Sequence, residues 1–303
     1  MEIGLGVDSR FALSEADHRA LAKEAVTLGY ESLWTPIGNT PEPFDICATW
    51  TEASGLATGI AVAPLSAWSI DDLASVSKKT IERCDGKFTL GIGVGRTTDA
   101  PIRVMREAIE ALRERLPKLR LYLGALGPQM LNLAGQRYDG AALNWCSAEQ
   151  VRWSREHVAA GARKARRDPA DVRLHEYIRV CVDDDEGAAR FAFAKTVLSY
   201  ALARPGTDKA MGYRGHFARM GFDEELSDLE SRRASGTSED ELAHVFPVEL
   251  LRRVGYWGKP EGARDAFLRL AEGLDIAVVR LVPARRNDLH AVRLAMRACA
   301  VKS

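Results

Sequence analysis

Short apolar runs alternate with amphipathic segments along the chain. Residues 2–8 form the first run, which is rich in Ile, Leu and Val. In the segment that follows, Ser14 is a candidate helix cap, and Leu21, Ala25 and Leu28 recur at helical spacing. Strands that helices cover on both faces have such continuous apolar runs. The pattern therefore predicts a strand followed by a helix, and the same alternation continues beyond it.

Eight apolar runs are predicted to be strands, and together they suggest the fold. They are residues 2–8, 31–37, 57–65, 87–95, 119–126, 141–146, 173–182 and 276–282. Strands that alternate with helices favour a parallel sheet. In a single α/β domain of 303 residues, closure into a (β/α)₈ TIM barrel is the simplest architecture. An open doubly wound sheet is the main alternative.

The regular alternation stops after the seventh predicted helix. Residues 204–245 are polar and charged, and they precede a short predicted helix at 247–254 and a larger one at 261–272. We interpret 204–245 as an insertion between helix 7 and strand 8, within a single domain that spans residues 1–303. We call it the insertion segment. It is expected to shape the pocket or to form a dimer contact, and the sequence leaves both roles open.

The composition limits the kinds of partner that we expect. Lys and Arg together number 42, as do Asp and Glu, so charge gives no reason to expect nucleic acid or a membrane surface as a partner. No apolar stretch reaches membrane-spanning length, and no signal peptide precedes the first strand. We expect a soluble, cytoplasmic protein. The five cysteines are scattered without a CxxC pair, and no His, Asp or Glu cluster has metal-ligand spacing, so neither a disulfide framework nor a metal site is expected.

Ligands of a (β/α)₈ barrel bind at the C-terminal ends of the strands, and this rule selects candidate site residues. Asp8 and Arg10 follow the first strand, and Arg179 lies near the end of the seventh. These three are candidates for polar contacts to a substrate, whereas the acid or base residue stays unidentified. His175 and Tyr177 share the face of Arg179, and a structural role is expected for His175.

Small residues end the third, fourth and sixth strands. Ala61, Val62 and Ala63 form either a wall for a flat ring or a buried strand end. Asn144 is a candidate to hydrogen-bond a ring, or a residue that forms a turn. The glycines at 91, 93 and 95 are unusual, because glycine weakens a strand unless its backbone approaches something closely. They predict either a ligand beside Gly95 and Arg96 or tight packing in the barrel wall.

The fifth strand leads into a helix through Gly127, Pro128, Gln129 and Met130. Free N–H groups at a helix N-terminus attract anions, and proline is tolerated in the first turn. These four residues therefore form either a phosphate site or only a tight turn.

Residues 121–135 (LYLGALGPQMLNLAG) and 139–145 (DGAALNW) closely resemble the luciferase-like superfamily. They look most like its coenzyme F420-dependent reductases and dehydrogenases, of the methylenetetrahydromethanopterin reductase type. Three further segments resemble the same superfamily more weakly and occur in the order expected for it: 29–34 (GYESLW), 86–95 (GKFTLGIGVG) and 258–261 (GKPE). The resemblance therefore covers nearly the whole chain.

The resemblance implies the barrel fold and coenzyme F420 as the cofactor, with FMN as the alternative. It implies that the segment from Gly127 to Met130 binds the cofactor phosphate, with Gly95 and Arg96 nearby. It also implies that the ring lies against a bulged third strand at Ala61 to Ala63, where relatives often have a non-proline cis peptide. A homodimer is implied only by this resemblance.

Two positions differ from the family pattern. Many F420-dependent relatives have an Asp-His pair after the second strand, where this chain has Ile37 and Gly38. Some also have a glutamate in the first strand, where this chain has Gly6. The usual acid and base residues therefore cannot be transferred to this sequence.

Three functions stay open. The first is hydride transfer between F420 and a small organic substrate, in which the cofactor supplies the chemistry. The second is an FMNH₂-dependent monooxygenase of a two-component system, with a flavin reductase as its partner. The third is a non-catalytic flavin-binding protein, which the missing Asp-His pair motivates. The fold serves all three, so it does not decide between them.

Overall fold

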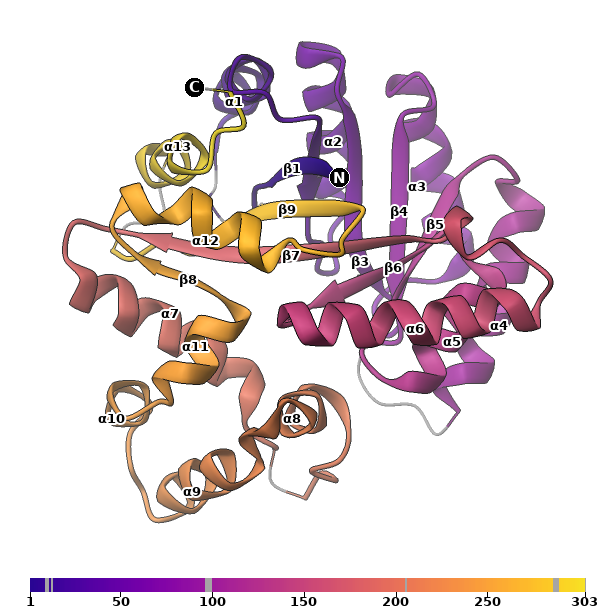
Figure 1. The fold of residues 1–303 in the computed structure, drawn as a ribbon. Helices are drawn as coiled ribbons and strands as arrows, with labels where there is room; N and C mark the ends of the chain where they lie inside the picture. Colours follow the sequence, from indigo (N-terminus) through magenta and orange to yellow (C-terminus); the bar gives the residue numbers. More distant parts are fainter. Residues whose placement is uncertain (9–10, 12, 96–99, 205, 286–288, 303) are drawn as a thin grey trace.

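The chain folds into a closed parallel barrel surrounded by helices, as the computed structural model shows in Figure 1. The structure describes residues 1–8, 11, 13–95, 100–204, 206–285 and 289–302. The ring has the strand order β1-β2-β3-β4-β5-β6-β7-β9, and the parallel pairs β6–β7 and β1–β9 close it. The predicted (β/α)₈ barrel is therefore confirmed.

The ring strands lie close to the predicted runs. They are β1 (Glu2–Gly6), β2 (Ser32–Thr35), β3 (Ala57–Pro64), β4 (Phe88–Gly93), β5 (Arg120–Gly124), β6 (Gly140–Asn144), β7 (Arg173–Val182) and β9 (Ile276–Leu281). The helices around them are α1 (Glu15–Thr27), α2 (Glu42–Ser54), α3 (Ile70–Arg83), α4 (Pro101–Arg115), α5 (Pro128–Arg137), α6 (Ala148–Lys164), α7 (Glu186–Ala201), α12 (Ala263–Leu270) and α13 (Leu289–Ala298). Ser14 caps α1 through a reciprocal capping box with Asp17.

One short strand was missed in the sequence. β8 (Gly255–Gly258) lies outside the ring and pairs with the C-terminal half of β7, where Arg179 is opposite Gly255. β6 ends at Asn144, opposite Tyr177, so it leaves the last residues of β7 without a ladder partner on that side. Backbone polar groups that are buried need hydrogen-bond partners, and β8 supplies them. Four residues, two of them glycine, are too few to show a strand pattern.

The insertion segment is helical. It contains α8 (Gly212–Phe217), a π-helical turn (Ala218–Phe222), α9 (Asp223–Ala234) and α10 (Glu239–His244), and α11 (Val248–Val254) follows it. In Figure 1, α8, α9 and α10 gather below α7 and α11. A second apolar cluster that includes Phe193, Phe217 and Leu250 joins these helices to the ring through Trp145.

Aromatic side chains fill the part of the barrel nearer the N-terminal ends of the strands. The ring centroids of Trp34 and His175 lie 4.2 Å apart, and Tyr122 stacks on Trp34. Glycine makes room for them, because a Cβ at Gly59 would lie 2.3 Å from the Trp34 ring. This layer closes the lower barrel, so an interior cavity can form only toward the C-terminal ends of the strands.

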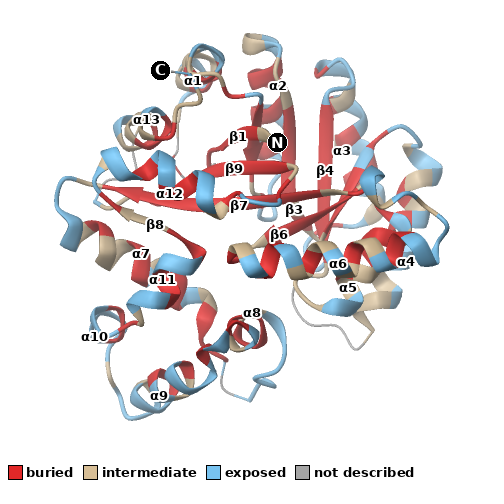
Figure 2. Cartoon of the chain, in the orientation of Figure 1, coloured by how far each residue is buried: buried red, intermediate tan, exposed pale blue. Residues whose placement is uncertain are grey.

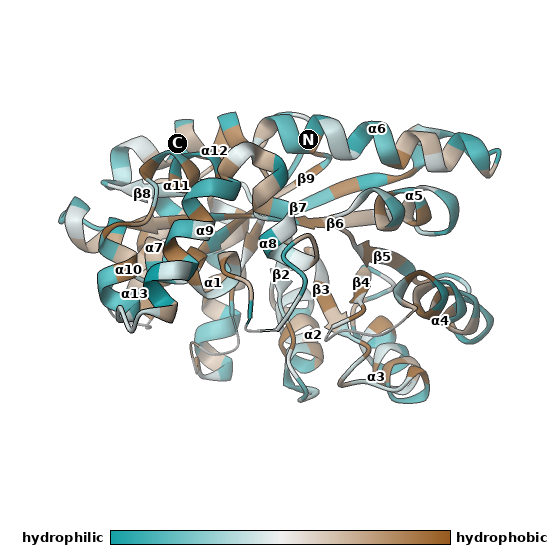
Figure 3. Ribbon diagram, turned by 90° about the horizontal axis from the view of Figure 1, so that it is seen from below, coloured by the Kyte–Doolittle hydropathy of each residue, from teal (hydrophilic) through white to brown (hydrophobic). Residues whose placement is uncertain are grey.

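The strands are buried, and the exposed residues lie on the outer faces of the helices (Figure 2). The same outer faces are mostly hydrophilic (Figure 3). No helix in the described part of the chain is long and apolar enough to cross a membrane.

Candidate functional site

A cavity of about 760 Å³ lies at the C-terminal ends of the ring strands. Its lining comes from β3–β7 and β9, from the loops that follow β1, β2, β4 and β5, from α2 and α7, and from the insertion segment. The residues are Asp8, Pro36, Ile37, Gly38, Thr40, Glu42, Ala61, Val62, Gly93, Gly95, Gly124, Ala125, Leu126, Ala142, Leu143, Asn144, Tyr177, Arg179, Tyr200, Tyr213 and Arg280. Its volume falls within the usual range for small-molecule sites, and it lies where barrel enzymes bind their ligands.

The cavity brings together six of the residues that were selected from the sequence. They are Asp8, Ala61, Val62, Gly95, Asn144 and Arg179. Ala63 is fully buried and packs in the layer between strands and helices, so it does not line the cavity. The predicted phosphate residues from Gly127 to Met130 form the start of α5 next to Leu126, which does line it. Arg10 and Arg96 lie outside the described residues.

The third strand is bulged at the expected place. The peptide bond between Ala61 and Val62 is cis, and the β3–β4 register shifts between Ile60 and Ala63. The Val62 side chain then lies over glycines of the neighbouring strands: a Cβ would lie 2.9 Å from it at Gly91 and 3.0 Å at Gly93. These two glycines therefore make room for Val62, and the bulge forms an apolar cavity wall.

Arg179, Asn144 and Tyr213 form a hydrogen-bonded chain on another side of the cavity. Arg179 Nη1 donates to Asn144 Oδ1 at 2.5 Å and to the Tyr177 carbonyl at 3.0 Å. Asn144 Nδ2 in turn donates to the Tyr213 hydroxyl at 2.6 Å. Tyr213 belongs to α8, which lies over the strands at the centre of the molecule when it is seen from below (Figure 3). The insertion segment therefore contributes a side chain to the cavity, as expected for one of its two open roles.

Burial changes the ionisation of this chain of groups. It lowers the pKa of the Arg179 guanidinium, whose carbon lies 3.8 Å from the centroid of the Trp145 ring. It raises the pKa of the Tyr213 phenol, and the Asn144 hydrogen bond opposes that rise. The phenol is therefore protonated at neutral pH. Because its oxygen accepts from Asn144, its own proton stays available for donation.

Asp8 and Arg280 form a buried ion pair in the same cavity, with Arg280 Nη2 2.5 Å from Asp8 Oδ2. Two further donors lack partners: Arg280 Nη1 and the Tyr177 hydroxyl make no hydrogen bond within the described structure. Buried polar groups are usually hydrogen-bonded, so such donors at a cavity are candidate ligand contacts.

A buried acidic group lies behind the site. The backbone N–H of Cys146 donates to Glu176 Oε1 at 2.6 Å, while Oε2 has no partner among the described residues. Burial raises the pKa of Glu176 to about 8. Burial also raises the pKa of the Cys146 thiol, which disfavours the thiolate that a nucleophilic role would need. His175 has its pKa lowered to about 3 by burial, so it is a neutral packing residue.

The start of α5 has features of an anion site. Gly127 is the N-cap and has no side chain to bond the first-turn N–H groups, and Pro128 occupies the first turn. Arg219 donates to the Leu126 carbonyl at 3.0 Å, which brings a cation to this helix end. Both features favour an anion there. Among the described residues, no group of three or more His, Cys, Asp or Glu could hold a metal ion.

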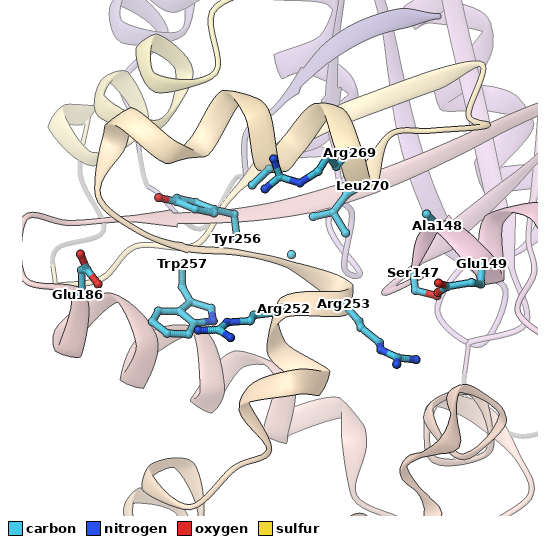
Figure 4. Close-up of a pocket in the computed structure, with 12 residues that line it drawn as sticks. Ser147, Ala148, Glu149, Glu186, Arg252, Arg253, Tyr256, Trp257, Arg269 and Leu270 are labelled. Carbon is cyan, nitrogen blue, oxygen red and sulfur yellow. The ribbon is translucent and has the colours of Figure 1, made fainter.

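A second cleft, of about 530 Å³, lies outside the ring between the start of α6, α11, β8 and α12 (Figure 4). Arg252, Arg253 and Arg269 line it together with Glu149 and Trp257. It contains no residue of the barrel interior. We therefore assign the candidate site to the cavity inside the ring.

Tyr213, Tyr200 and Arg280 were not selected from the sequence. Arg280 had a signal, because it is the one charged residue in the apolar run from 276 to 282. Tyr213 had no such signal in the sequence, because the insertion segment has no periodicity that predicts which side chains face the barrel. Only the packing of α8 brings it to Asn144.

The chain is similar to known oxidoreductases over nearly its whole length. Residues 6–275 match the model of the luciferase-like monooxygenase family. The 5,10-methylenetetrahydromethanopterin reductase of Methanolobus tindarius is 26% identical over 318 residues, which cover 90% of this chain and 92% of that protein.

Two solved structures have the same fold. The coenzyme F420-dependent tetrahydromethanopterin reductase of Methanopyrus kandleri has a TM-score of 0.73 at 15% identity, with 97% of this chain and 96% of that one covered. An F420-dependent secondary alcohol dehydrogenase, solved with an F420-acetone adduct, has a TM-score of 0.72 at 14% identity, with coverages of 100% and 99%.

Proposed function

The chain belongs to the luciferase-like monooxygenase family of oxidoreductases, and we propose that it transfers a hydride between coenzyme F420 and a small organic substrate. One observation carries the proposal. The apolar wall at Val62 and the polar chain of Arg179, Asn144 and Tyr213 line one cavity. A wall of this kind suits a flat ring, and the polar chain suits the oxygen of a substrate. Two structurally similar proteins are F420-dependent enzymes by name.

The residues present fit such a cofactor. Val62 and Gly124 would contact one face of the ring, Gly95 would lie at its edge, and the first turn of α5 with Arg219 would bind its phosphate. When bound, coenzyme F420 supplies or accepts the hydride. The protein would hold the two reactants in contact and would exclude water from the inner end of the cavity.

Tyr213 is the proposed proton donor for reduction of a substrate carbonyl group. As the hydride reaches the carbonyl carbon, the electron pair of the C=O bond moves to oxygen, and the Tyr213 hydroxyl gives that oxygen its proton. Arg179 acts through Asn144 to stabilise the phenolate that results, and water then reprotonates it. This arrangement would replace the Asp-His pair whose place Ile37 and Gly38 occupy.

The first experiment is a cofactor titration that follows intrinsic tryptophan fluorescence, with F420 and FMN compared. We expect saturable micromolar binding of F420 and much weaker binding of FMN. Anaerobic turnover is then tested on a panel of secondary alcohols, ketones and enones. If neither cofactor binds, hydride transfer is refuted.

An FMNH₂-dependent monooxygenase is the second candidate, because the family model that matches the chain describes monooxygenases. It predicts preference for FMN, incorporation of oxygen from O₂, and stimulation by a flavin reductase. A non-catalytic flavin-binding protein predicts tight binding without turnover of any compound in the panel. The proposed homodimer is tested by sedimentation, in which a single-chain species would contradict it.

A further inference from the structure

Among the described residues, one positive charge at the inner end of the cavity has no carboxylate as its ion-pair partner. Arg179 is only 7% exposed, and its hydrogen-bond partners are the neutral groups Asn144 Oδ1 and the Tyr177 carbonyl. No carboxylate forms an ion pair with it within the described structure. Arg280, by contrast, is paired with Asp8. Within the described part of the chain, two arginines therefore face one carboxylate, and burial of an unpaired charge is costly unless a ligand supplies the partner.

Two hydrogen-bond donors lie next to this charge. Arg280 Nη1 and the Tyr177 hydroxyl are buried and make no hydrogen bond within the described residues, and the Arg280 guanidinium carbon lies 5.3 Å from the centroid of the Tyr177 ring. Both residues line the cavity. Leaving such donors unpaired costs stability, so an acceptor at this point would bind favourably.

A smaller chamber, of about 350 Å³, adjoins the cavity at this point. Asp8, Arg179, Tyr200 and Arg280 line both spaces. Beyond them, apolar side chains and the hydroxyls of α7 line the chamber. The further residues are Phe11, Thr196, Ser199, Leu281, Val282 and Pro283. None of them comes from β3–β6 or α5, which contain the proposed cofactor contacts, so the chamber extends away from the cofactor side.

We propose that the substrate carries an anionic oxygen group, a carboxylate or a phosphate monoester, which Arg179, Arg280 and Tyr177 bind where the two spaces meet. The inference rests on the proposed function and gives it a substrate class. Guanidinium groups suit both anions, because their N–H groups match the oxygens in pairs. The reacting carbonyl group lies in the larger cavity on the cofactor side, and any further part of the substrate extends from the anion into the smaller chamber, against Phe11 and the hydroxyls of Thr196 and Ser199. The oxygen to be protonated lies within reach of Tyr213.

Binding of matched probes tests the substrate class without turnover. Acetoacetate, acetol phosphate and the neutral methyl acetoacetate are titrated by calorimetry, with and without saturating F420. We expect at least one anion to bind about tenfold or more tightly than the neutral ester. Whichever of the two anions binds more tightly shows whether the substrate carries a carboxylate or a phosphate group. Equal binding of the ester refutes the inference, and so does displacement of the anion by F420, because the arginines would then serve the cofactor.

Variants assign the binding to these residues. Arg179→Gln should weaken binding of the anion at least tenfold and leave binding of the ester unchanged. Tyr177→Phe keeps the ring, so the variant should fold normally. It should weaken binding of the anion several-fold. Arg285→Gln is the matched control, because Arg285 is exposed and pairs with Asp183 and Asp185 outside both spaces. Unchanged anion binding in both test variants would overturn the assignment.

The two hypotheses fail separately. If the anion binds through Arg179 but neither F420 nor FMN binds, the proposed function is wrong. If F420 binds and the anions bind no better than the ester, only the substrate class is wrong.

Discussion

The hydroxyl oxygen of Tyr213 accepts a hydrogen bond of 2.6 Å from the side-chain amide of Asn144, 69 residues earlier in the chain. Tyr213 lies in the insertion segment, and Asn144 is the last residue of β6. The contact joins α8 to the barrel at the cavity. The insertion segment is therefore part of the candidate site.

Replacement of Tyr213 by Phe tests the proposed proton donor. The ring would keep its edge contact with Tyr200, at 4.9 Å between centroids, but the hydroxyl would be lost. We expect kcat for ketone reduction to fall about 100-fold or more, since general acid catalysis contributes on this scale. The dissociation constant of F420 should not change, because Tyr213 is not among the proposed cofactor contacts.

Tyr256→Phe is the matched control for Tyr213→Phe. The Tyr256 hydroxyl donates to the Lys259 carbonyl outside the cavity, so kcat should stay at the wild-type value. If Tyr213→Phe turns over at the wild-type rate across the pH range, Tyr213 is not the proton donor.

Arg214 should hold the insertion segment in place. Its guanidinium is buried and donates to Glu230, Asp223 and Ser227 of α9. Arg214→Met would leave Glu230 with only Lys209 and the Ala203 N–H as partners, and loss of a buried charge-assisted hydrogen bond costs about 1–3 kcal/mol. We expect a lower midpoint in urea and faster limited proteolysis between residues 204 and 245.

Arg232→Met provides the comparison for Arg214→Met. Arg232 forms an exposed pair with Asp228 on the same helix, and such pairs contribute about 0–1 kcal/mol. Equal proteolysis of the two variants would show that the buried pair does not anchor the segment.

Glu176 should make the protein less stable as the pH rises. Its folded-state pKa of about 8 lies above the ordinary value of 4.5, so the folded state retains a proton that the unfolded state loses between these values. The stability contribution is fully present below pH 4.5 and is lost as the pH rises through about 8. Between about pH 5.5 and 7 the unfolding free energy should fall by about 1.4 kcal/mol per pH unit, and the slope should drop to about half of this at pH 8.

Glu176→Gln should remove this slope, because the amide still accepts from Cys146 and does not ionise. Urea unfolding at intervals of half a pH unit measures the difference between variant and wild type. The exposed Glu249→Gln should leave the slope unchanged. A difference between Glu176→Gln and wild type that is independent of pH would refute the raised pKa.

Gly59→Ala should destabilise the lower barrel. The new Cβ would lie 2.3 Å from the Trp34 ring, which His175 contacts and whose Nε1 donates to Ser32. Overpacking of a rigid core costs about 1–3 kcal/mol, and the upper part of that range is expected here. Gly38→Ala is the control, because no described atom beyond Gly38 itself and its two chain neighbours lies within 4 Å of the added Cβ. Equal thermal midpoints for the two variants would contradict the packing argument.

Much of the fold followed from local signals. The strand at 173–182 has the predicted bounds, and Ser14 caps α1 as expected. These features depend on apolar periodicity and on hydrogen bonds between near neighbours, which a sequence displays directly. The strand from 255 to 258 was missed because it forms only against the free edge of β7.

Only part of the candidate site could be predicted from the sequence. Asp8, Val62 and Arg179 were selected because strand ends form the mouth of a barrel. The glycines at 91 and 93 allowed two explanations in the sequence, and the position of Val62 against them favours packing in the wall. The start of α5 was selected as an anion site, and that role stays a prediction.

The sequence by itself determined the alternation of strands and helices, the barrel and the end of it that contains the site. Only the tertiary structure decided which side chains meet there. The pairing of Asp8 with Arg280, and of Asn144 with Tyr213, spans 272 and 69 residues. Barrel closure and the docking of α8 set these distances, and contacts between such distant residues leave no periodic signal in the chain.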